Sequence, residues 1–504
     1  KDRGLMTRPD YRERKARILS RTRRIGAGVV GLLMVLVLPA PTASTASKAD
    51  DDKSSRPNFV VIMVDDARRD DVEYMHKSRR LVGDKGATFT KAYAPTPLCC
   101  PARAAFLTGQ YGHNTGVLSN NPKYGGFESF ADDSTLATWL HPTYATAWIG
   151  KYLNGYASGS DNDDYIPPGW THWAAPIQGV WQYKDHTLNI DGERVRNRGV
   201  YSADLHAALT HRFIRERAGG SRPFFVVASY LAPHTGLPRE SDDPPGLRTP
   251  HVERRYRDSY AGPSPRQSPA FNEKNMSDKR PSVRNNPRFT VEEKRRITEV
   301  NAQRRESLRS VDEKVKNTIR VLAATGELDN TYVVLLSDNG YLLGEHRVQV
   351  GKKLPYEPSN HLPLMIRGPG VEKGQVEGLV GLHDLAPTIL ELAGMQDASG
   401  GFPIDGKDFT PQLRGQRPPD RKRSVVLEMS DNLGGYAYHG IVRQDGWKYV
   451  EFTTEGVNEV EMYNLDKDPH ELRNLSDKRR YAKVQARLDA EMRRLMDCKA
   501  ADCE

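Results

Sequence analysis

The chain has 504 residues, of which 37% are hydrophobic and 28% are charged, a composition typical of a globular protein with a sizeable core. Its four cysteines are too few for a disulfide scaffold. The formal net charge of +9 predicts a basic surface that favours anionic substrates. Zinc-finger spacing and aromatic-rich RNA-binding motifs do not occur in the sequence, so we expect no nucleic-acid partner.

The N-terminus has the three regions of a secretory signal. RERKARILSRTRR is basic, IGAGVVGLLMVLVLPA is apolar, and PTASTASKA is small and polar. This order predicts a signal peptide within residues 1–48, cleaved near Ala46, and therefore an extracellular protein. The apolar run is shorter than the roughly 20 residues of a membrane span, so we expect no stable membrane association after cleavage. An uncleaved anchor is the alternative.

Three continuous apolar runs predict strands that are buried on both faces of a sheet. They are NFVVIMVDD from Asn58, PFFVVASYLAPH from Pro223 and TYVVLLSDNG from Thr331. Helical patterns alternate with them, the clearest beginning at a capping box in Thr290–Glu293 and ending near Gly326. Another helix is expected around Leu385–Ala393. Residues 55–400 therefore predict an α/β domain with a large, mostly parallel sheet between helices.

Composition changes at two later points of the chain. Residues 237–288 are rich in Pro, Arg, Asp and Ser, which predicts a long basic surface insertion. After residue 400, the runs SVVLEMS, YHGIVRQDGWKYVEF and EVEMYNL predict short antiparallel strands, with Asp445-Gly446 as a hairpin turn. With a final helix near Tyr481–Met496, residues 401–504 are expected to form a small C-terminal β-sheet subdomain.

The cysteines form two pairs with different properties. Cys498 and Cys503 lie five residues apart, where a disulfide could close a small terminal loop in an exported protein; two free thiols are the alternative. Cys99 and Cys100 are adjacent, and a disulfide between neighbouring residues strains the backbone. A disulfide between Cys99 and Cys100 therefore does not account for their being adjacent in the sequence.

Carboxylates follow two of the predicted strands. Asp65 and Asp66 come directly after the first apolar run, and Asp338 and Asn339 follow the third. Adjacent carboxylates repel each other unless a cation neutralises them, and oxygen ligands favour calcium, with magnesium as the alternative. Because parallel strands bring their ends to one edge of a sheet, the two pairs together predict a cation site there. An ordinary charged loop is the alternative for either pair alone.

The adjacent cysteines lie in the stretch PLCCPARAAFLTG, which resembles a known family signature. Cys99, Pro101, Arg103 and Leu107-Thr108-Gly109 resemble the signature of the sulfatase family, a formylglycine-dependent group within the alkaline-phosphatase-like superfamily. The resemblance implies that a formylglycine-generating enzyme, a transient partner, oxidises Cys99 to an aldehyde whose hydrate binds the cation and attacks sulfur. It also implies that Cys100 is a variable position, which we interpret as a small buried side chain.

Further residues of this sequence match other positions of the sulfatase pattern. Lys151 in WIGKYL and Lys352 in GKKLPYE resemble ligands of the sulfate oxygens, with Lys353 as the alternative to Lys352. His234 in LAPHTG resembles the histidine that contacts sulfate and protonates the leaving oxygen. Arg103 is expected to hold the hydrated aldehyde. Positive groups arranged in this way would stabilise an anion that gains charge on its leaving oxygen.

Two positions depart from the family pattern. Leu153 stands where many sulfatases have a histidine, so the base that releases sulfate is open, with His113 and His346 as candidates. Ala102 replaces a common serine, a change of similar size that we expect to be tolerated.

The resemblance extends to one branch of the family. GKYLNGY, SVDEKV, ATGELDNTY, SDNGY and MIRGPG resemble the N-acetylglucosamine-6-sulfatase branch, which also has Leu after GKY. This implies a secreted hydrolase of the 6-O-sulfate of glucosamine in sulfated glycans. The alternatives are an arylsulfatase, a phosphonate or phosphate ester hydrolase of the same superfamily, and a secreted glycan-binding module without catalysis.

Overall fold

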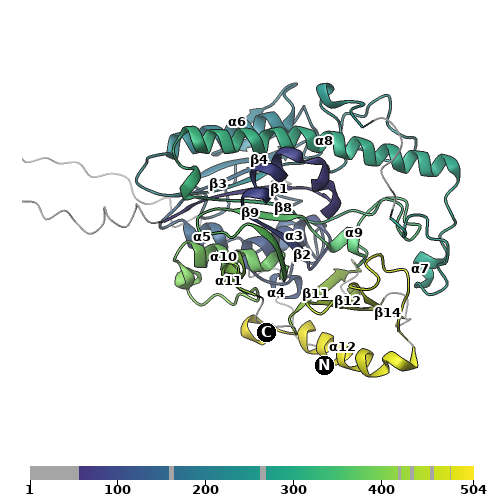
Figure 1. Ribbon diagram of the computed structural model, residues 1–504. Helices are drawn as coiled ribbons and strands as arrows, with labels where there is room; N and C mark the ends of the chain where they lie inside the picture. The colour runs from purple at the N-terminus through teal and green to yellow at the C-terminus, as the bar shows by residue number, and fades with distance from the viewer. Residues whose placement is uncertain are drawn as a thin grey trace, which may run out of the picture. The chain divides into compact units, whose positions relative to one another are not determined.

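The computed structural model describes residues 56–157, 164–260, 268–417, 422–431, 436–453, 459–476 and 478–503. The predicted signal peptide, residues 1–48, lies outside them. Among the described residues, no helix is both long enough and apolar enough to cross a bilayer. The unit Asp51–Glu504 contains two β-sheets, which Figure 1 shows with their covering helices.

The larger sheet has ten strands in the order β10-β2-β9-β8-β1-β7-β3-β4-β5-β6. Their bounds are β1 Asn58–Val64, β2 Ala87–Tyr93, β3 Ala145–Gly150, β4 His172–Gln178, β5 Thr187–Ile190, β6 Glu193–Arg196, β7 Phe224–Ser229, β8 Thr331–Ser337, β9 Leu364–Arg367 and β10 Gly374–Gly381. Strands β8, β1, β7, β3 and β4 are parallel neighbours, with antiparallel pairs on either side. The three apolar runs are the adjacent strands β8, β1 and β7, so the predicted fold class is confirmed.

Helices cover both faces of this sheet (Figure 1). Their bounds are α2 His76–Leu81, α3 Cys99–Thr108, α4 Gly112–Thr115, α5 Leu136–Leu140, α6 Ser202–Arg217, α7 Pro281–Arg284, α8 Val291–Ala324, α9 Glu357–Asn360, α10 Leu385–Leu392 and α11 Thr410–Leu413. Phe59, Val61 and Met63 share a core cluster with residues of α3, α5 and α10. The alternate β1 residues pack with α6 and α8 instead. Burial on both faces explains why β1 is apolar throughout rather than alternating.

The capping box predicted for the long helix is present. Thr290 Oγ1 accepts a hydrogen bond from the Glu293 amide at 3.2 Å, and Glu293 Oε2 accepts one from the Thr290 amide at 2.8 Å. The helix α8 that follows has 34 residues, and its apolar positions cover β1 and β7.

The predicted insertion, residues 237–288, is only partly exposed where it is described. Its residues Val252, Met276 and Val283 are buried, and α7 lies within it. Met276 and Val283 pack with Leu342 and Tyr356 in one apolar cluster. The domain boundaries proposed from the sequence stay predictions.

The second sheet is antiparallel, in the order β11-β12-β13-β14. Its strands are β11 Ser424–Ser430, β12 Tyr436–Arg443, β13 Trp447–Phe452 and β14 Glu459–Asn464, and the helix α12 is Ala482–Met496. Apolar residues of α12 pack on one face of this sheet. Lys448 in β13 is buried and forms ion pairs with Glu357 of α9 at 3.0 Å and with Glu471 at 2.8 Å. This charge pairing joins the second sheet to the body of the protein.

The chain after α12 is hydrogen-bonded to helix α4. Cys498 and Cys503 form a disulfide, which decides between the two alternatives left open by the sequence. The ring of His113 lies between Glu428 Oε2, 2.9 Å from Nδ1, and the carbonyl oxygen of Cys498, 3.0 Å from Nε2. Burial opposes the charge on this ring, but Glu428 outweighs it and raises the pKa of His113 to about 9.

The raised pKa predicts a pH-dependent stability. Because His113 binds its proton more tightly in the folded state, its contribution is complete below pH 6.5 and is lost as the pH rises through about 9. We expect about 3 kcal/mol of unfolding free energy to be lost over this interval. Chemical denaturation at several pH values would measure it. His113→Gln should remove most of this dependence, and an unchanged profile in that variant would contradict the assignment.

Candidate active site

The predicted site residues meet at the carboxyl edge of the large sheet. Asp65-Asp66 and Asp338-Asn339 follow the adjacent strands β1 and β8, and Lys151 follows β3. The amide of Asp66 donates to Asp338 Oδ1 at 3.1 Å, so the two strand ends are in direct contact. The convergence that the sequence predicts is therefore confirmed, at the edge where α/β sheets place their ligands.

Cys99 is the first residue of α3. Leu98, in extended conformation, precedes the helix, and Pro101 lies in its first turn, where a missing amide hydrogen costs nothing. The helix ends at Gly109, whose φ of 71° is left-handed and whose amide bonds to the carbonyl of Ala105. Every residue of α3 is buried. The signature sequence therefore forms a short helix that fixes Cys99 inside the protein.

The thiol of Cys99 lies between opposite charges. Lys352 Nζ is 2.9 Å and Lys151 Nζ is 3.4 Å from Sγ, and the thiol is 3.5 Å from Asp65 Oδ1. Burial, together with Asp65, outweighs the two lysines and raises the pKa of Cys99 to about 11. The thiol therefore stays protonated at neutral pH, unlike the thiolate nucleophile of cysteine hydrolases.

Arg103 lies one helical turn after Cys99 and has no exposed surface. Its Nε donates to Asp338 Oδ2 at 2.9 Å, and Nη2 donates to Asp65 Oδ2 at 3.2 Å. Nη1 donates to the carbonyl of Lys151 at 2.6 Å and to Ser229 Oγ at 2.8 Å. Arg103 thus links the ends of β1, β8, β3 and β7. The expected contact with the modified Cys99 stays a prediction.

Both the backbone carbonyl and the carboxylate of Asp66 accept hydrogen bonds. Its φ of 69° is left-handed, a conformation that aspartate tolerates, and its carbonyl accepts from the buried Arg304. Lys352 Nζ and Asn339 Nδ2 both donate to Asp66 Oδ1, the latter at 2.7 Å. Burial opposes the carboxylate charge, but Lys352 and His234 overcome it and lower the pKa of Asp66 to about 2.

His234 lies in the loop after β7. Its Nδ1 donates to the carbonyl of Thr235 at 2.6 Å, and its Nε2 is 3.7 Å from Asp66 Oδ2. Burial lowers the pKa of His234, although the nearby Asp65 and Asp66 oppose this. The Nε2 side of the ring therefore faces the charged cluster.

The donor set fits a hard divalent cation. Ligand atoms of Asp65, Asp66, Cys99 and His234 lie within 4.8 Å of one another. The amide oxygen of Asn339 faces the same cluster, 3.4 Å from Lys352 Nζ. Both oxygens of Asp338 accept hydrogen bonds, from Arg103 and from backbone amides. Carboxylate and amide oxygens are ligands that calcium and magnesium prefer.

Side-chain charges in the cluster are balanced. Ion pairs join the carboxylates of Asp65, Asp66 and Asp338 to Lys151, Lys352 and Arg103. A bound divalent cation would leave the site positive, which suits an anionic substrate.

The structure separates several sequence alternatives. Lys352 is in the cluster, whereas Lys353 is exposed. Cys100 is buried in the core, as expected. His113 bonds to Glu428, and His346 Nδ1 bonds to Glu273 at 2.7 Å. Neither histidine is among the described side chains that hydrogen-bond to Cys99, so neither gains support as the base that releases sulfate.

Two further residues contribute to the site and were not expected from the sequence. Ser229, the last residue of β7, accepts from Arg103 and donates to the carbonyl of Lys151 at 2.7 Å. Trp181 stacks on His234, with ring centroids 4.5 Å apart, and lies 4.4 Å from Lys151 Nζ. The position of Ser229 at a strand end was a usable signal, whereas nothing in the sequence around Trp181 marks it.

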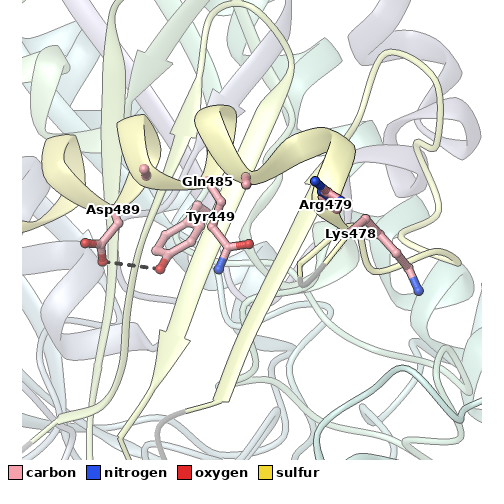
Figure 2. Close-up of a pocket in the computed structure, with 7 residues that line it drawn as sticks. Tyr449, Lys478, Arg479, Gln485 and Asp489 are labelled. Carbon is pink, nitrogen blue, oxygen red and sulfur yellow. Dashed lines mark hydrogen bonds between the residues drawn. The ribbon is translucent and has the colours of Figure 1, made fainter.

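A cavity of about 400 Å³ lies elsewhere, between β13 and α12 (Figure 2). Tyr449 donates to Asp489 across it at 3.3 Å, and Lys478 and Arg479 lie at one end. None of its lining residues belongs to the charged cluster around Cys99.

Comparison with known proteins shows similarity over most of the chain. The N-acetylglucosamine-6-sulfatase of Capra hircus is 30% identical over 476 residues, covering 84% of this chain and 80% of the relative. The arylsulfatase of Volvox carteri is 30% identical over 520 residues, covering 94% and 79%. The extracellular sulfatase SULF-1 homolog of Drosophila melanogaster is 32% identical over 376 residues; the match spans 72% of this chain but only 32% of that protein.

The fold is also found in solved structures. The structure of BT4656 in complex with its substrate D-glucosamine-2-N,6-O-disulfate matches with a TM-score of 0.72 and 23% identity, covering 87% of this chain and 97% of the other. Residues 57–395 match the family described as Sulfatase, and residues 344–498 match the family described as N-sulphoglucosamine sulphohydrolase, C-terminal. The chain therefore belongs to the sulfatase family and is a sulfuric ester hydrolase with the alkaline-phosphatase-like fold.

Proposed function

We propose that the protein hydrolyses the 6-O-sulfate of glucosamine in sulfated glycans, with formylglycine at position 99 and a divalent cation, calcium or magnesium. The observation that carries the chemistry is the position of Cys99, buried at the start of α3 between Lys151 and Lys352. A sulfate group brought to this atom would meet two ammonium groups at once. The protonated thiol by itself has no comparable reactivity.

Each residue of the cluster has a proposed role. A formylglycine at position 99 would supply a hydrated aldehyde: one hydroxyl would attack sulfur and displace the alcohol, and the second would lose its proton so that the aldehyde reforms as sulfate leaves. Lys151 and Lys352 bind sulfate oxygens, and His234, when its ring is protonated on both nitrogens, donates the Nε2 proton to the leaving oxygen of the ester. Arg103 positions Asp65 and Asp338 through its hydrogen bonds. Preorganised positive charge of this kind lowers the barrier because it needs no rearrangement during the reaction.

Asp65, Asp66, Asp338 and Asn339, together with the modified Cys99, are the proposed ligands of the cation. A cation held by these residues would supply Lewis-acid polarisation of the oxygen on a formylglycine at position 99. Because Arg103 and backbone amides already hold Asp338, the carboxylates are fixed before a cation binds.

The sugar substrate is supported by sequence similarity. N-acetylglucosamine-6-sulfatases match most of the chain at about 30% identity. The equally extensive match to an arylsulfatase favours aryl sulfate esters as the second candidate. We also propose that the protein is exported, in keeping with its predicted signal peptide and with the extracellular relative.

Replacing Cys99 tests the nucleophile. Cys99→Ala should lower the rate of sulfate ester hydrolysis at least 10³-fold, because the atom that attacks sulfur is removed. Assays of purified protein from the native host would measure this, alongside mass spectrometry of the peptide Ala92–Arg103. The matched control is Cys100→Ala, which should keep most of the activity. An active Cys99→Ala protein would overturn the mechanism.

Replacing Asp66 tests the cation site. Asp66→Asn keeps the side-chain shape but removes one negative charge, so calcium affinity should fall at least tenfold. Isothermal titration calorimetry of chelator-treated protein would measure the affinity without reference to activity. Glu292→Gln removes an exposed carboxylate and should leave affinity unchanged. Equal affinity in all three proteins would place the cation elsewhere.

A direct comparison of substrates tests the proposed specificity. We expect a higher kcat/KM for glucosamine 6-sulfate than for phenyl sulfate or phenyl phosphate, measured as release of sulfate or phosphate. Phenyl sulfate as the best substrate would favour the arylsulfatase alternative. Faster phosphate release would favour the phosphate ester hydrolase. Binding of sulfated glycan without release of sulfate would identify a binding module.

A further inference from the structure

Exposure changes steadily across the active site. Cys99 and Arg103 are fully buried. The side chains of Lys352 and His234 are 12% and 15% exposed, and Trp181 is 36% exposed. The opening of the site therefore lies on the side of Lys352, His234 and Trp181. A sulfate ester whose sulfur reaches residue 99 must extend its alcohol part toward that side.

Trp181 belongs to the loop between β4 and β5 and is held rigidly at this opening. Its indole is nearly parallel to the His234 ring, at an interplanar angle of 15°. Its carbonyl accepts from the amide of Leu237 at 2.7 Å. A Cβ on Gly236 would lie 2.6 Å from the same carbonyl oxygen, so only glycine permits this approach. The loop after β7, which carries His234, thus fixes the position of Trp181.

Two exposed apolar side chains, Trp181 and Leu237, lie on neighbouring segments at this side of the site. Among the described residues, the large hydrophobic side chains that are exposed number five, and Trp181 and Leu237 are two of them. These two belong to paired segments, since Gln182 and Leu237 form a β-bridge. An anionic sulfate gains nothing from such a surface. The apolar C–H face of a sugar ring, or an aryl ring, packs well against indole.

We infer that Trp181, with Leu237 beside it, forms the wall that contacts the alcohol part of the ester and selects alcohols that contain a ring. This deepens the proposed function, because it concerns how the same site distinguishes its substrates. The sulfate end is held by charge, whereas the alcohol end is recognised by apolar contact. Trp181 is a specificity-determining residue in this scheme, and it also packs against His234 and Lys151.

Two esters with the same type of leaving group isolate the contribution of the ring. Glucosamine 6-sulfate and ethyl sulfate both release a primary alcohol, so they differ in the ring rather than in the bond that breaks. For Trp181→Ala, we expect binding of glucosamine 6-sulfate to weaken at least tenfold more than binding of ethyl sulfate. Trp181→Phe should restore part of the loss, and Val291→Ala, at a position that is 80% exposed on α8, should have no effect.

Calorimetric titration in the presence of Ca²⁺, with each substitution introduced into the Cys99→Ala chain, measures binding apart from catalysis. Phenyl sulfate is titrated in parallel. The reference protein carries Cys99→Ala alone. If it binds phenyl sulfate but not glucosamine 6-sulfate, the proposed sugar substrate is wrong, while the role of Trp181 is still tested with the aryl ring. Equal losses for ring and ethyl esters would show that Trp181 only supports His234 and Lys151, and would overturn the inference. The inference would also be overturned if Trp181→Ala weakened the binding of no ester, or if the chain with Cys99→Ala alone bound no ester that contains a ring.

Discussion

The buried guanidinium of Arg103 is the interaction on which the rest of the site depends. It bonds to two carboxylates, one hydroxyl and one backbone carbonyl, which follow or end four neighbouring strands. Without it, Asp65 and Asp338 would be buried charges with fewer partners, and breaking a buried ion pair is far more costly than breaking one at the surface. The signature helix, the sheet edge and the carboxylates are therefore one structural unit. The same bonds that stabilise the fold hold the ligands of the proposed cation in place.

This arrangement divides the work between strands and loops. Strand ends supply the carboxylates and Lys151, whose positions are fixed by the parallel register of β8, β1, β7 and β3. Loops supply His234, Lys352 and Trp181, which form the more exposed part of the site. Fixed charge at the buried end suits a sulfate group that is common to all substrates of the family. Residues on loops can differ between relatives without disturbing the sheet. The inferred contact of Trp181 with the alcohol belongs to this part of the site.

Local patterns were sufficient to predict much of this architecture. Continuous apolar runs identified β1, β7 and β8, and the signature identified Cys99 and Arg103, because each depends on residues close together in sequence. The choice of Lys352 over Lys353 also agrees with the structure. Contacts between distant segments were not predictable in the same way. Trp181 meets His234 only because two loops pair, and His113 forms bonds with Glu428 and Cys498 that lie more than 300 residues away. Nothing in the sequence next to either residue records such a partner.

The complete burial of Cys99 also bears on the order of events in the life of the chain. A helix that is buried along its whole length cannot be reached by a second enzyme once β1, β3 and β8 have closed around it. The proposed oxidation of this residue would therefore have to take place on the unfolded chain, before the sheet forms. Because folding would then enclose any Cys99 that had not been oxidised, the fraction of active molecules would be set before folding is complete rather than by a later equilibrium.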